Sequence, residues 1–334
     1  MKNYKHYIGI DVSKKTLDFH IVNSAAKMII IGKISNDLKG IKELFKELRR
    51  HKISKDESLF CFENTGVYSM NLCMILFEFN IDFAHCSALE IKQSKGICRG
   101  KSDKADAKDI ALYALRNIDK IRLSDVPETD ILTLKLLYAE REKTVAAIKD
   151  FGSTEENKNF LPKVVYRPTE KINKKTLIFL KKMLLEIERS IREIIHRNNE
   201  LQQQKKLLLS VLGIGEVTSL YLLLAIKGFK SFPNWRKFAC YCGIVPFEYS
   251  SGTSIRGKSK VSHFADKKMK SILHLAALSA IKHDAEIRTY YERKKQEGKH
   301  SLLVINNVKC KIISRAFAVI ARNEAFVNTY KFAS

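Results

Sequence analysis

Short apolar segments of strand length, separated by turns and by helical patterns, constrain the fold of the first third of the chain. Tyr7–Val12, Leu17–Val22 and Lys27–Ile34 follow one another closely and predict an antiparallel meander. Ser58–Phe62 and Ile81–Ala84 predict two more strands, each reached through a segment of helical periodicity. Because helices then alternate with strands, we expect a mixed α/β sheet covered by helices.

A heptad pattern dominates the middle of the chain. Its positions lie three and four residues apart, with one polar insertion, at Leu177, Leu180, Leu184, Ile187, Ile191, Ile194, Asn198 and Leu201. A less regular apolar stripe lies on an earlier helix, and Phe151–Pro168 between the two is predicted to be a loop because it contains Gly, Pro, Asn and Ser. The pattern fits an antiparallel hairpin within one chain or a coiled coil between two chains, and both remain open.

Positive charge is concentrated in the last part of the chain. The sequence has 60 Lys and Arg against 36 Asp and Glu, a formal charge of +24. Residues 207–334 contain 21 of these basic and 8 of these acidic side chains. Such a surplus favours a polyanionic partner such as DNA or RNA, although charge alone also fits an ordinary basic enzyme. We expect the main nucleic-acid-binding face in this part.

Two apolar helical segments open this last part and are joined by Gly213-Ile214-Gly215. The pattern is typical of a helix-hairpin-helix, whose turn can direct backbone N–H groups at a phosphate. A plain helix–helix connection is the simpler interpretation of the turn alone. We therefore expect three regions, namely an α/β domain over residues 1–125, a helical coiled-coil region over 126–206 and a small, mainly helical domain over 207–334.

The sequence excludes several other classes. The longest apolar run, Tyr221–Ile226, is far shorter than the ~20 residues of a membrane helix, and Met1–Ile10 lacks the pattern of a secretory signal. We therefore expect no membrane association and a cytoplasmic protein. Its seven cysteines are widely spaced and form no zinc-binding pattern, so they are predicted to be reduced thiols.

Carboxylates interrupt or end the apolar strands of the first part. Asp11 lies in Ile8-Gly9-Ile10-Asp11-Val12, and Glu63 ends the Ser58–Phe62 strand. Asp103 and Asp106 are three residues apart at a predicted helix start and share one face. Converging carboxylates would form a site for Mg²⁺. The alternative is that Asp11 and Glu63 emerge at a sheet edge while the other two stabilise a helix end.

Three blocks of this first part resemble the DEDD insertion-sequence transposases, which are related to the Piv DNA invertases. They are Gly9-Ile10-Asp11-Val12-Ser13-Lys14, Glu63-Asn64-Thr65-Gly66-Val67-Tyr68 and Lys101-Ser102-Asp103-Lys104-Ala105-Asp106-Ala107. The last part is similar to the transposase domain of the same family in Gly213-Ile214-Gly215, Phe232, the run from Ala239 to Pro246, Ser250-Ser251-Gly252 and Gly257. The blocks occur in the family's order and span nearly the whole chain.

The resemblance implies a RuvC-like, ribonuclease-H-like first domain, a coiled coil and a small helical domain that carries a serine. It implies that Asp11, Glu63, Asp103 and Asp106 hold Mg²⁺, with Mn²⁺ as an alternative ion. It also implies that Ser251 attacks a DNA phosphate and forms a phosphoserine link. The expected partners are double-stranded donor and target DNA, a non-coding bridge RNA and further copies of the chain, in a dimer to tetramer acting at the bacterial nucleoid.

The residues around the serine fit this role. A serine hydroxyl needs a base or a metal to act as a nucleophile, and no His lies close to Ser251 in the sequence. Gly252 permits a sharp turn, although a flexible polar loop is the simpler interpretation of Ser250 to Ser254. Residues expected to contact nucleic acid are Gly213, Gly215, Arg256, Lys258, Lys260, Lys267 and Lys268.

Three functions are therefore compared. The first is a DNA transposase or site-specific recombinase that uses both the carboxylates and Ser251. The second is a RuvC-like, metal-dependent junction resolvase or nuclease, which would use water as the nucleophile and would not need Ser251. The third is an actin-like phosphotransferase, but Ile10-Asp11-Val12-Ser13-Lys14 lacks the glycine of its phosphate loop. We expect the first.

Overall fold

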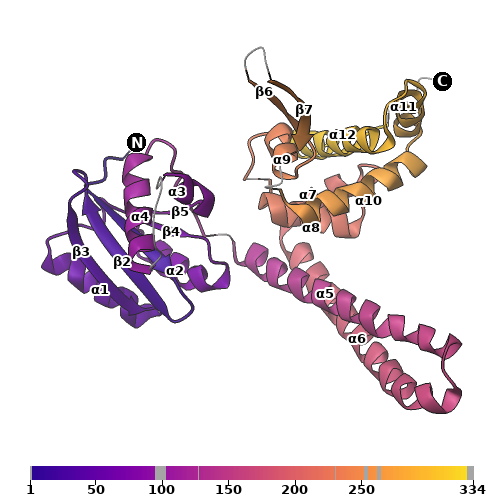
Figure 1. Ribbon diagram of the computed structural model, residues 1–334, viewed down its shortest axis with the longest axis horizontal. Helices are drawn as coiled ribbons and strands as arrows, with labels where there is room; N and C mark the ends of the chain where they lie inside the picture. The colour runs from indigo at the N-terminus through magenta and orange to yellow at the C-terminus, as the bar shows by residue number, and fades with distance from the viewer. Residues whose placement is uncertain are drawn as a thin grey trace. The chain divides into compact units, whose positions relative to one another are not determined.

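The computed structural model describes residues 2–94, 103–126, 128–229, 231–251, 255–261 and 265–328. Within these ranges, side chains are not described at positions 103, 104, 154, 155, 157, 248–251, 255, 256 and 258–260. The chain divides into two compact units, Met1–Val126 and Pro127–Ser334 (Figure 1). The expected coiled-coil region and the expected last domain thus fall within one unit.

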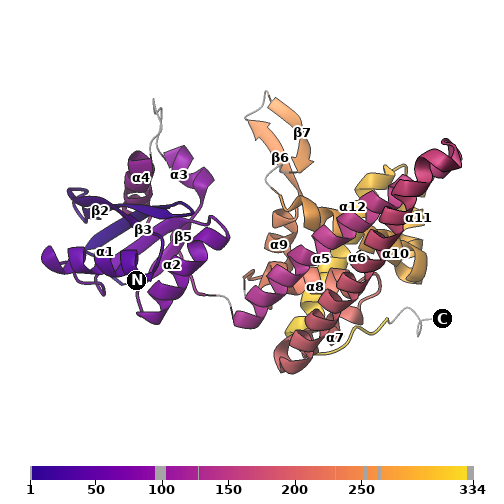
Figure 2. The same cartoon turned by 90° about the horizontal axis from the view of Figure 1, so that it is seen from below.

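The first unit is a five-stranded mixed sheet with helices on both faces (Figures 1 and 2). The strand order is β3-β2-β1-β4-β5, with β1, β2 and β3 antiparallel and β4 and β5 parallel to β1. The mixed α/β architecture predicted from the sequence is confirmed. Its elements are β1 (His6–Val12), β2 (Thr16–Asn23), β3 (Met28–Ser35), α1 (Leu38–Arg50), β4 (Ser58–Glu63), α2 (Val67–Glu78), β5 (Phe83–Cys86), α3 (Ala88–Ser94) and α4 (Asp103–Arg116).

Alternation along the strands divides the core of this unit into two layers. Ile8 and Ile10 of β1 pack with the apolar side chains of α1 and α2 on one face. Tyr7 of the same strand packs with Ile91 of α3 and Ile110 of α4 on the other face. The predicted strand Ile81–Ala84 lies two residues later in the structure, because Phe83 and not Ile81 pairs with β4. The strands β1, β2, β4 and β5 therefore each have one face toward α1 and α2 and the other toward α3 and α4.

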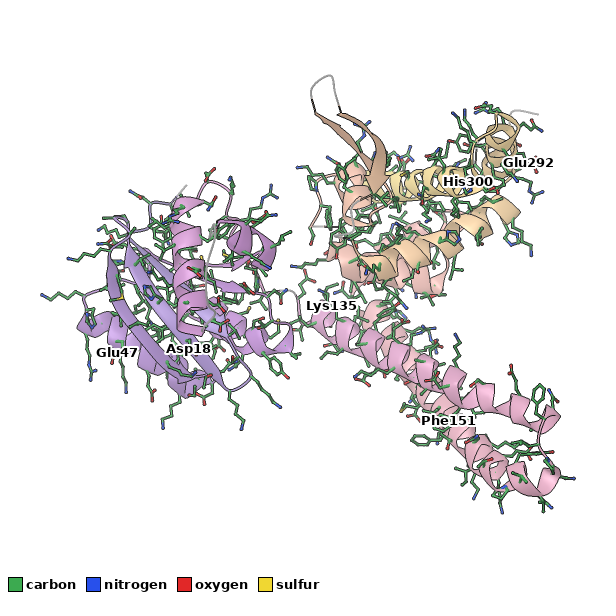
Figure 3. All side chains as sticks on the ribbon, in the orientation of Figure 1. Asp18, Glu47, Lys135, Phe151, Glu292 and His300 are labelled. Atoms are coloured by element: carbon green, nitrogen blue, oxygen red, sulfur yellow. The ribbon has the colours of Figure 1, made fainter. Side chains whose placement is uncertain are left out.

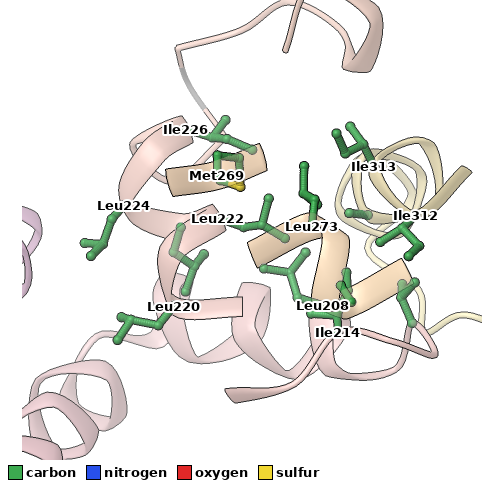
Figure 4. Packing of buried hydrophobic residues seen from close by; sticks show 14 of the residues in the cluster. Leu208, Ile214, Leu220, Leu222, Leu224, Ile226, Met269, Leu273, Ile312 and Ile313 are labelled. Atoms are coloured by element: carbon green, nitrogen blue, oxygen red, sulfur yellow. The ribbon is translucent and has the colours of Figure 1, made fainter. Parts of the chain in front are cut away.

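The described residues of the second unit form helices and one β-hairpin (Figure 1). The helices α7, α8, α10 and α12 enclose one apolar core, in which Leu208, Leu222, Leu273 and Ile312 point toward one another (Figure 4). The elements are α5 (Thr129–Ser153), the 3₁₀ helix Thr154–Asn159, α6 (Lys163–Arg197), α7 (Asn199–Leu209), α8 (Glu216–Ile226), α9 (Trp235–Tyr241), β6 (Pro246–Ser251), β7 (Ile255–Val261), α10 (Lys267–His283), α11 (Ala285–Gln296) and α12 (Ser301–Arg322).

The helices α5 and α6 pack side by side as an antiparallel hairpin, with Lys135 toward one end of α5 and Phe151 toward the other (Figure 3). The hairpin is one of the two arrangements that the heptad pattern left open, and pairing between chains stays a prediction. Ile178, Phe179 and Leu185 of α6 are exposed.

Two local predictions in this region are wrong. Phe151–Pro168 is not a loop, because α5 continues to Ser153 and α6 already begins at Lys163, with Pro168 inside it. The heptad helix does not continue through Asn198, where α6 ends and α7 begins. The Asn198 side chain accepts from the backbone N–H of Leu201 at 3.1 Å and therefore caps the second helix. Spacing alone could not separate a polar heptad position from this cap.

Candidate active site

Asp11 and Glu63 lie at the carboxyl ends of two neighbouring parallel strands. The register pairs Gly9 with Cys61 and Ile10 with Phe62, which brings the next residues of both strands to the same level. Tyr7 and Cys61 belong to the layer under α4, so alternation places Asp11 and Glu63 on that face as well. Both side chains are half-buried. The sheet thus brings these two predicted carboxylates together at one edge.

Gly9 sets how closely α4 approaches this edge. A Cβ atom at Gly9 would lie 2.2 Å from the carbonyl oxygen of Ala107 and 2.4 Å from the backbone nitrogen of Ala111. Only glycine permits the helix to rest directly on the strand at this position. Asp106, which is half-buried, precedes Ala107 by one residue, and Gly9 precedes Asp11 by two. Gly9 therefore sets the distance between β1, which carries Asp11, and α4, which carries Asp106, and the motif alone did not indicate this role.

The four predicted carboxylates are only partly described. Asp103 is the first residue of α4, but its side chain lies outside the described residues. Among the side chains that are described, no three from His, Cys, Asp and Glu form a group able to hold a metal ion. Carboxylate oxygens are nevertheless the ligands that Mg²⁺ and Mn²⁺ prefer. The chemistry of the donors at this edge therefore fits a hard divalent cation.

A further carboxylate, which no sequence pattern indicated, lies beside Asp11. Asp18 of β2 pairs directly with Asp11 of β1, and it is 3% exposed. Two like charges directly opposite each other are unfavourable unless one is neutralised. Lys33 of β3, opposite Asp18 on the other side, places its Nζ 2.9 Å from the Asp18 carboxylate. Only the register reveals this row of charges.

His20 lies on the same face, under α4. It is 3% exposed, and neither ring nitrogen has a hydrogen-bond partner among the described residues. Burial lowers the pKa of this imidazole, and the nearby Lys108 ammonium lowers it further against a smaller opposing effect of Asp109. The lowered pKa favours the neutral form of His20 beside the acidic edge.

Ser251 belongs to a hairpin that the sequence analysis did not predict. It is the last residue of β6 and pairs with Ile255 of β7, where a polar loop was the simpler expectation. The signal was an alternation of Phe247 and Tyr249 before the serines. The side chain of Ser251 lies outside the described residues, as do those of Arg256, Lys258 and Lys260 in the hairpin.

The Gly213-Ile214-Gly215 turn does connect two helices, α7 and α8. Gly213 has a φ of +96°, and a Cβ atom there would lie 2.6 Å from the carbonyl oxygen of Ala276 in α10. Packing alone therefore explains this glycine. The first residue of α8, Glu216, carries a carboxylate beside the turn and forms an ion pair of 2.6 Å with Lys205. A negative charge at this helix start disfavours a phosphate there.

The two lysines expected to contact nucleic acid in α10 differ in their surroundings. Lys268 forms an ion pair with Glu142 of α5, which neutralises it within the unit. Lys267 has no acidic partner among the described ion pairs and lines a groove between α10 and α12. Of these two adjacent lysines, Lys268 is paired within the unit, whereas Lys267 lines the groove without a described ion-pair partner.

Comparison with known proteins identifies related chains. Residues 8–154 match the DEDD transposase model of the IS110 family, and residues 205–292 match the model described as transposase of the IS116/IS110/IS902 family. The chain is 25% identical to the pilin gene-inverting protein of Moraxella bovis over 328 residues, which are 96% of this chain and 98% of that protein. It is 32% identical to an uncharacterized 43.6 kDa protein of insertion element IS110 from Streptomyces coelicolor over 113 residues, 34% of this chain and 28% of that protein.

Among solved structures, RuvC of T. thermophilus in complex with a Holliday junction substrate aligns with 36% of this chain and 100% of that chain. The identity is 13% and the TM-score is 0.26, which is too low to establish a common fold.

Two parts of the chain thus match transposase models of the IS110 family, and together these matches support an IS110-family DEDD transposase. It is an enzyme that cleaves and recombines DNA, and its family implies dependence on a divalent metal. No helix in the described part of the chain has the length and apolar character needed to span a bilayer.

Proposed function

We propose that the strand ends of the first unit form the RuvC-like catalytic centre for DNA recombination. Asp11, Glu63 and Asp106, with Asp103, would hold a divalent cation, Mg²⁺ or alternatively Mn²⁺. The observation that carries this proposal is the pairing of β1 and β4, which brings Asp11 and Glu63 to one edge on the α4 face. A bound cation would stabilise the negative charge that develops on a phosphodiester during cleavage.

The proposal also names Ser251 as the nucleophile. The Ser251 Oγ attacks the phosphorus and forms an O–P bond, while one deoxyribose oxygen leaves with its bond electrons and takes up a proton. A hydroxyl of another DNA strand then attacks the phosphoserine, which rejoins DNA and restores the serine. The match to the DEDD transposase model favours the alternative, a RuvC-like reaction in which water attacks and no covalent link forms.

The proposed partners are donor and target DNA at the bacterial nucleoid, a bridge RNA and further copies of the chain. The formal charge of +24 supports nucleic acid as the substrate. The exposed apolar side chains of α6, including Ile178 and Phe179, support association between hairpins of two copies.

The test uses the full-length protein with Mg²⁺, RNA from the element's non-coding end and a donor–target DNA pair. Asp11→Asn is expected to abolish cleavage, whereas the exposed Asp119→Asn leaves it intact. Ser251→Ala is expected to abolish a covalent protein–DNA adduct on denaturing gels, with the neighbouring Ser250→Ala as the matched control. Cleavage by Ser251→Ala at the normal rate would support water as the nucleophile instead.

A further inference from the structure

A groove with a volume of about 570 Å³ lies between α10 and α12 of the second unit. Its α10 wall includes Lys267, Lys270 and His274, which are three, four and seven residues apart and therefore share one helical face. Its α12 wall includes Asn306 and Lys309. Two helices thus direct three lysines and one histidine into the same groove.

Lys309 is the unusual member of this group. It is 4% exposed, although lysine is among the residue types least often buried without a partner. Its ammonium group donates a hydrogen bond to the Asn306 side-chain oxygen at 3.0 Å. No described residue forms an ion pair with Lys267, Lys270 or Lys309. A buried ammonium with only an amide partner carries an uncompensated charge.

The surroundings of Lys309 make the positive charge of its ammonium group less favourable. Burial lowers the pKa of its ammonium group, and the positive charge of Lys270 lowers it further. A cluster of cations without a counter-ion favours the binding of an anion, because each ammonium then gains an opposite charge.

We propose that the groove between α10 and α12 binds a phosphate group of a nucleic-acid backbone. Lys309 contacts the phosphate oxygens from the base of the groove, and Lys267 and Lys270 contact them from its α10 wall. Leu275 and Leu302, which are 68% and 58% exposed and also line the groove, offer apolar surface to the attached sugar or base. Nucleic acid as the source of the phosphate rests on the proposed function, whereas anion binding itself does not.

The first experiment measures thermal unfolding of the full-length protein with inorganic phosphate at constant ionic strength. Without phosphate, Lys309→Met is expected to unfold at a higher temperature than the unaltered protein, because it removes the uncompensated charge. Phosphate is expected to raise the unfolding temperature of the unaltered protein, and to do so less in Lys309→Met and Lys270→Gln. An equal rise in all variants, or no rise in any, would overturn the proposal.

The matched control is Lys282→Gln, which removes one exposed charge from the same helix outside the groove. It is expected to respond to phosphate like the unaltered protein. Lys270 is half-buried, so Lys270→Gln tests the groove even if the change at the buried Lys309 prevents folding.

The second experiment distinguishes the two sources of the phosphate. Binding of a DNA duplex and of an RNA of equal length is measured at several salt concentrations. Lys270→Gln is expected to weaken binding of the occupant about tenfold and to reduce the salt slope by about one. If Lys270→Gln loses affinity for DNA alone or for RNA alone, that nucleic acid is the occupant of the groove. If it loses affinity for neither, the groove binds only free anions and its nucleic-acid role is overturned. Asp11→Asn, inactive if the proposed function holds, should keep the phosphate response unchanged.

Discussion

The sheet of the first unit and the α10/α12 groove of the second differ in how a buried charge is compensated. In the sheet of the first unit, the Asp18 carboxylate lies beside the Lys33 ammonium at 2.9 Å, although the Asp18 side chain is only 4% exposed. In the groove of the second unit, Lys309 is equally buried but has an amide oxygen as its hydrogen-bond partner. A buried charge with an internal counter-ion is part of the fold, whereas one without it favours a ligand from outside.

The second unit also contains a fully compensated buried charge. Asp284 is 0% exposed, caps α11 and lies 2.7 Å from a guanidinium nitrogen of Arg315. A second nitrogen of Arg315 lies 2.6 Å from Glu286. The difference between the sheet and the groove is therefore not a property of the whole second unit. Of the two charged side chains that are buried in the described part of this unit, Asp284 has a counter-ion and Lys309 does not.

The largest expected effect is from Arg315→Met, which leaves the buried Asp284 carboxylate without its counter-ion. We expect the free energy of unfolding to fall by about 3–5 kcal/mol in urea denaturation. Arg322→Met, on the exposed end of the same helix, should change it by less than about 0.5 kcal/mol. Similar losses in both variants would mean that the ion pair does not compensate the Asp284 carboxylate, and the contrast between Asp284 and Lys309 would then be wrong.

Gly9→Ala tests whether the acidic edge depends on the position of α4. The added methyl group meets backbone atoms of Ala107 and Ala111, so the helix must move at a cost of about 1–3 kcal/mol. Because Asp106 moves with the helix, DNA cleavage should fall even at temperatures where the variant remains folded.

Gly152→Ala is the control for this change. Beyond the neighbouring backbone of its own helix, no atom lies within 4 Å of the added methyl group, and alanine favours a helix over glycine by about 0.5–1 kcal/mol. Unaltered cleavage by Gly9→Ala would show that α4 does not position the site.

Lys33→Met removes the counter-ion of Asp18 and leaves this carboxylate directly opposite Asp11. Because the Lys33 side chain is 50% exposed, water screens part of the pair, and we expect a loss of only about 1 kcal/mol in denaturation experiments. The double variant Asp18→Asn/Lys33→Met should recover most of this loss, since no unpaired charge remains. A double variant as unstable as the single one would contradict the charge explanation.

Local sequence patterns predicted most elements of the first unit, but they did not show which residues are neighbours across strands. The apolar runs predicted the strands, and Asp11 and Glu63 stood out because they interrupt or end such runs. Asp18 and Lys33 could not be found, because cross-strand neighbours depend on register. Lys309 was equally hidden, because the other lysines of its groove lie on a helix some forty residues earlier in the chain. Asn198 was misassigned because a cap can fall on a heptad position.

The smallest predicted effect concerns His20 and acid. Burial lowers the pKa of His20 below its usual 6.5, so the unfolded chain binds a proton that the folded chain resists. Stability is therefore retained above pH 6.5 and lost as the pH falls through that value toward the lower pKa of the folded state. His20→Leu should remove this contribution, which has a slope of at most about 1.4 kcal/mol per pH unit.

The measurement compares urea denaturation of the unaltered protein and His20→Leu between pH 8 and 5. The chain has nine histidines, and burial also lowers the pKa of His6, so only the difference between the two proteins reports His20. Parallel curves would mean that His20 gains a proton as readily in the folded chain as in the unfolded one. Lys108 would then not repel that proton, and charge on α4 would have no measurable influence on the face of the sheet that carries Asp11.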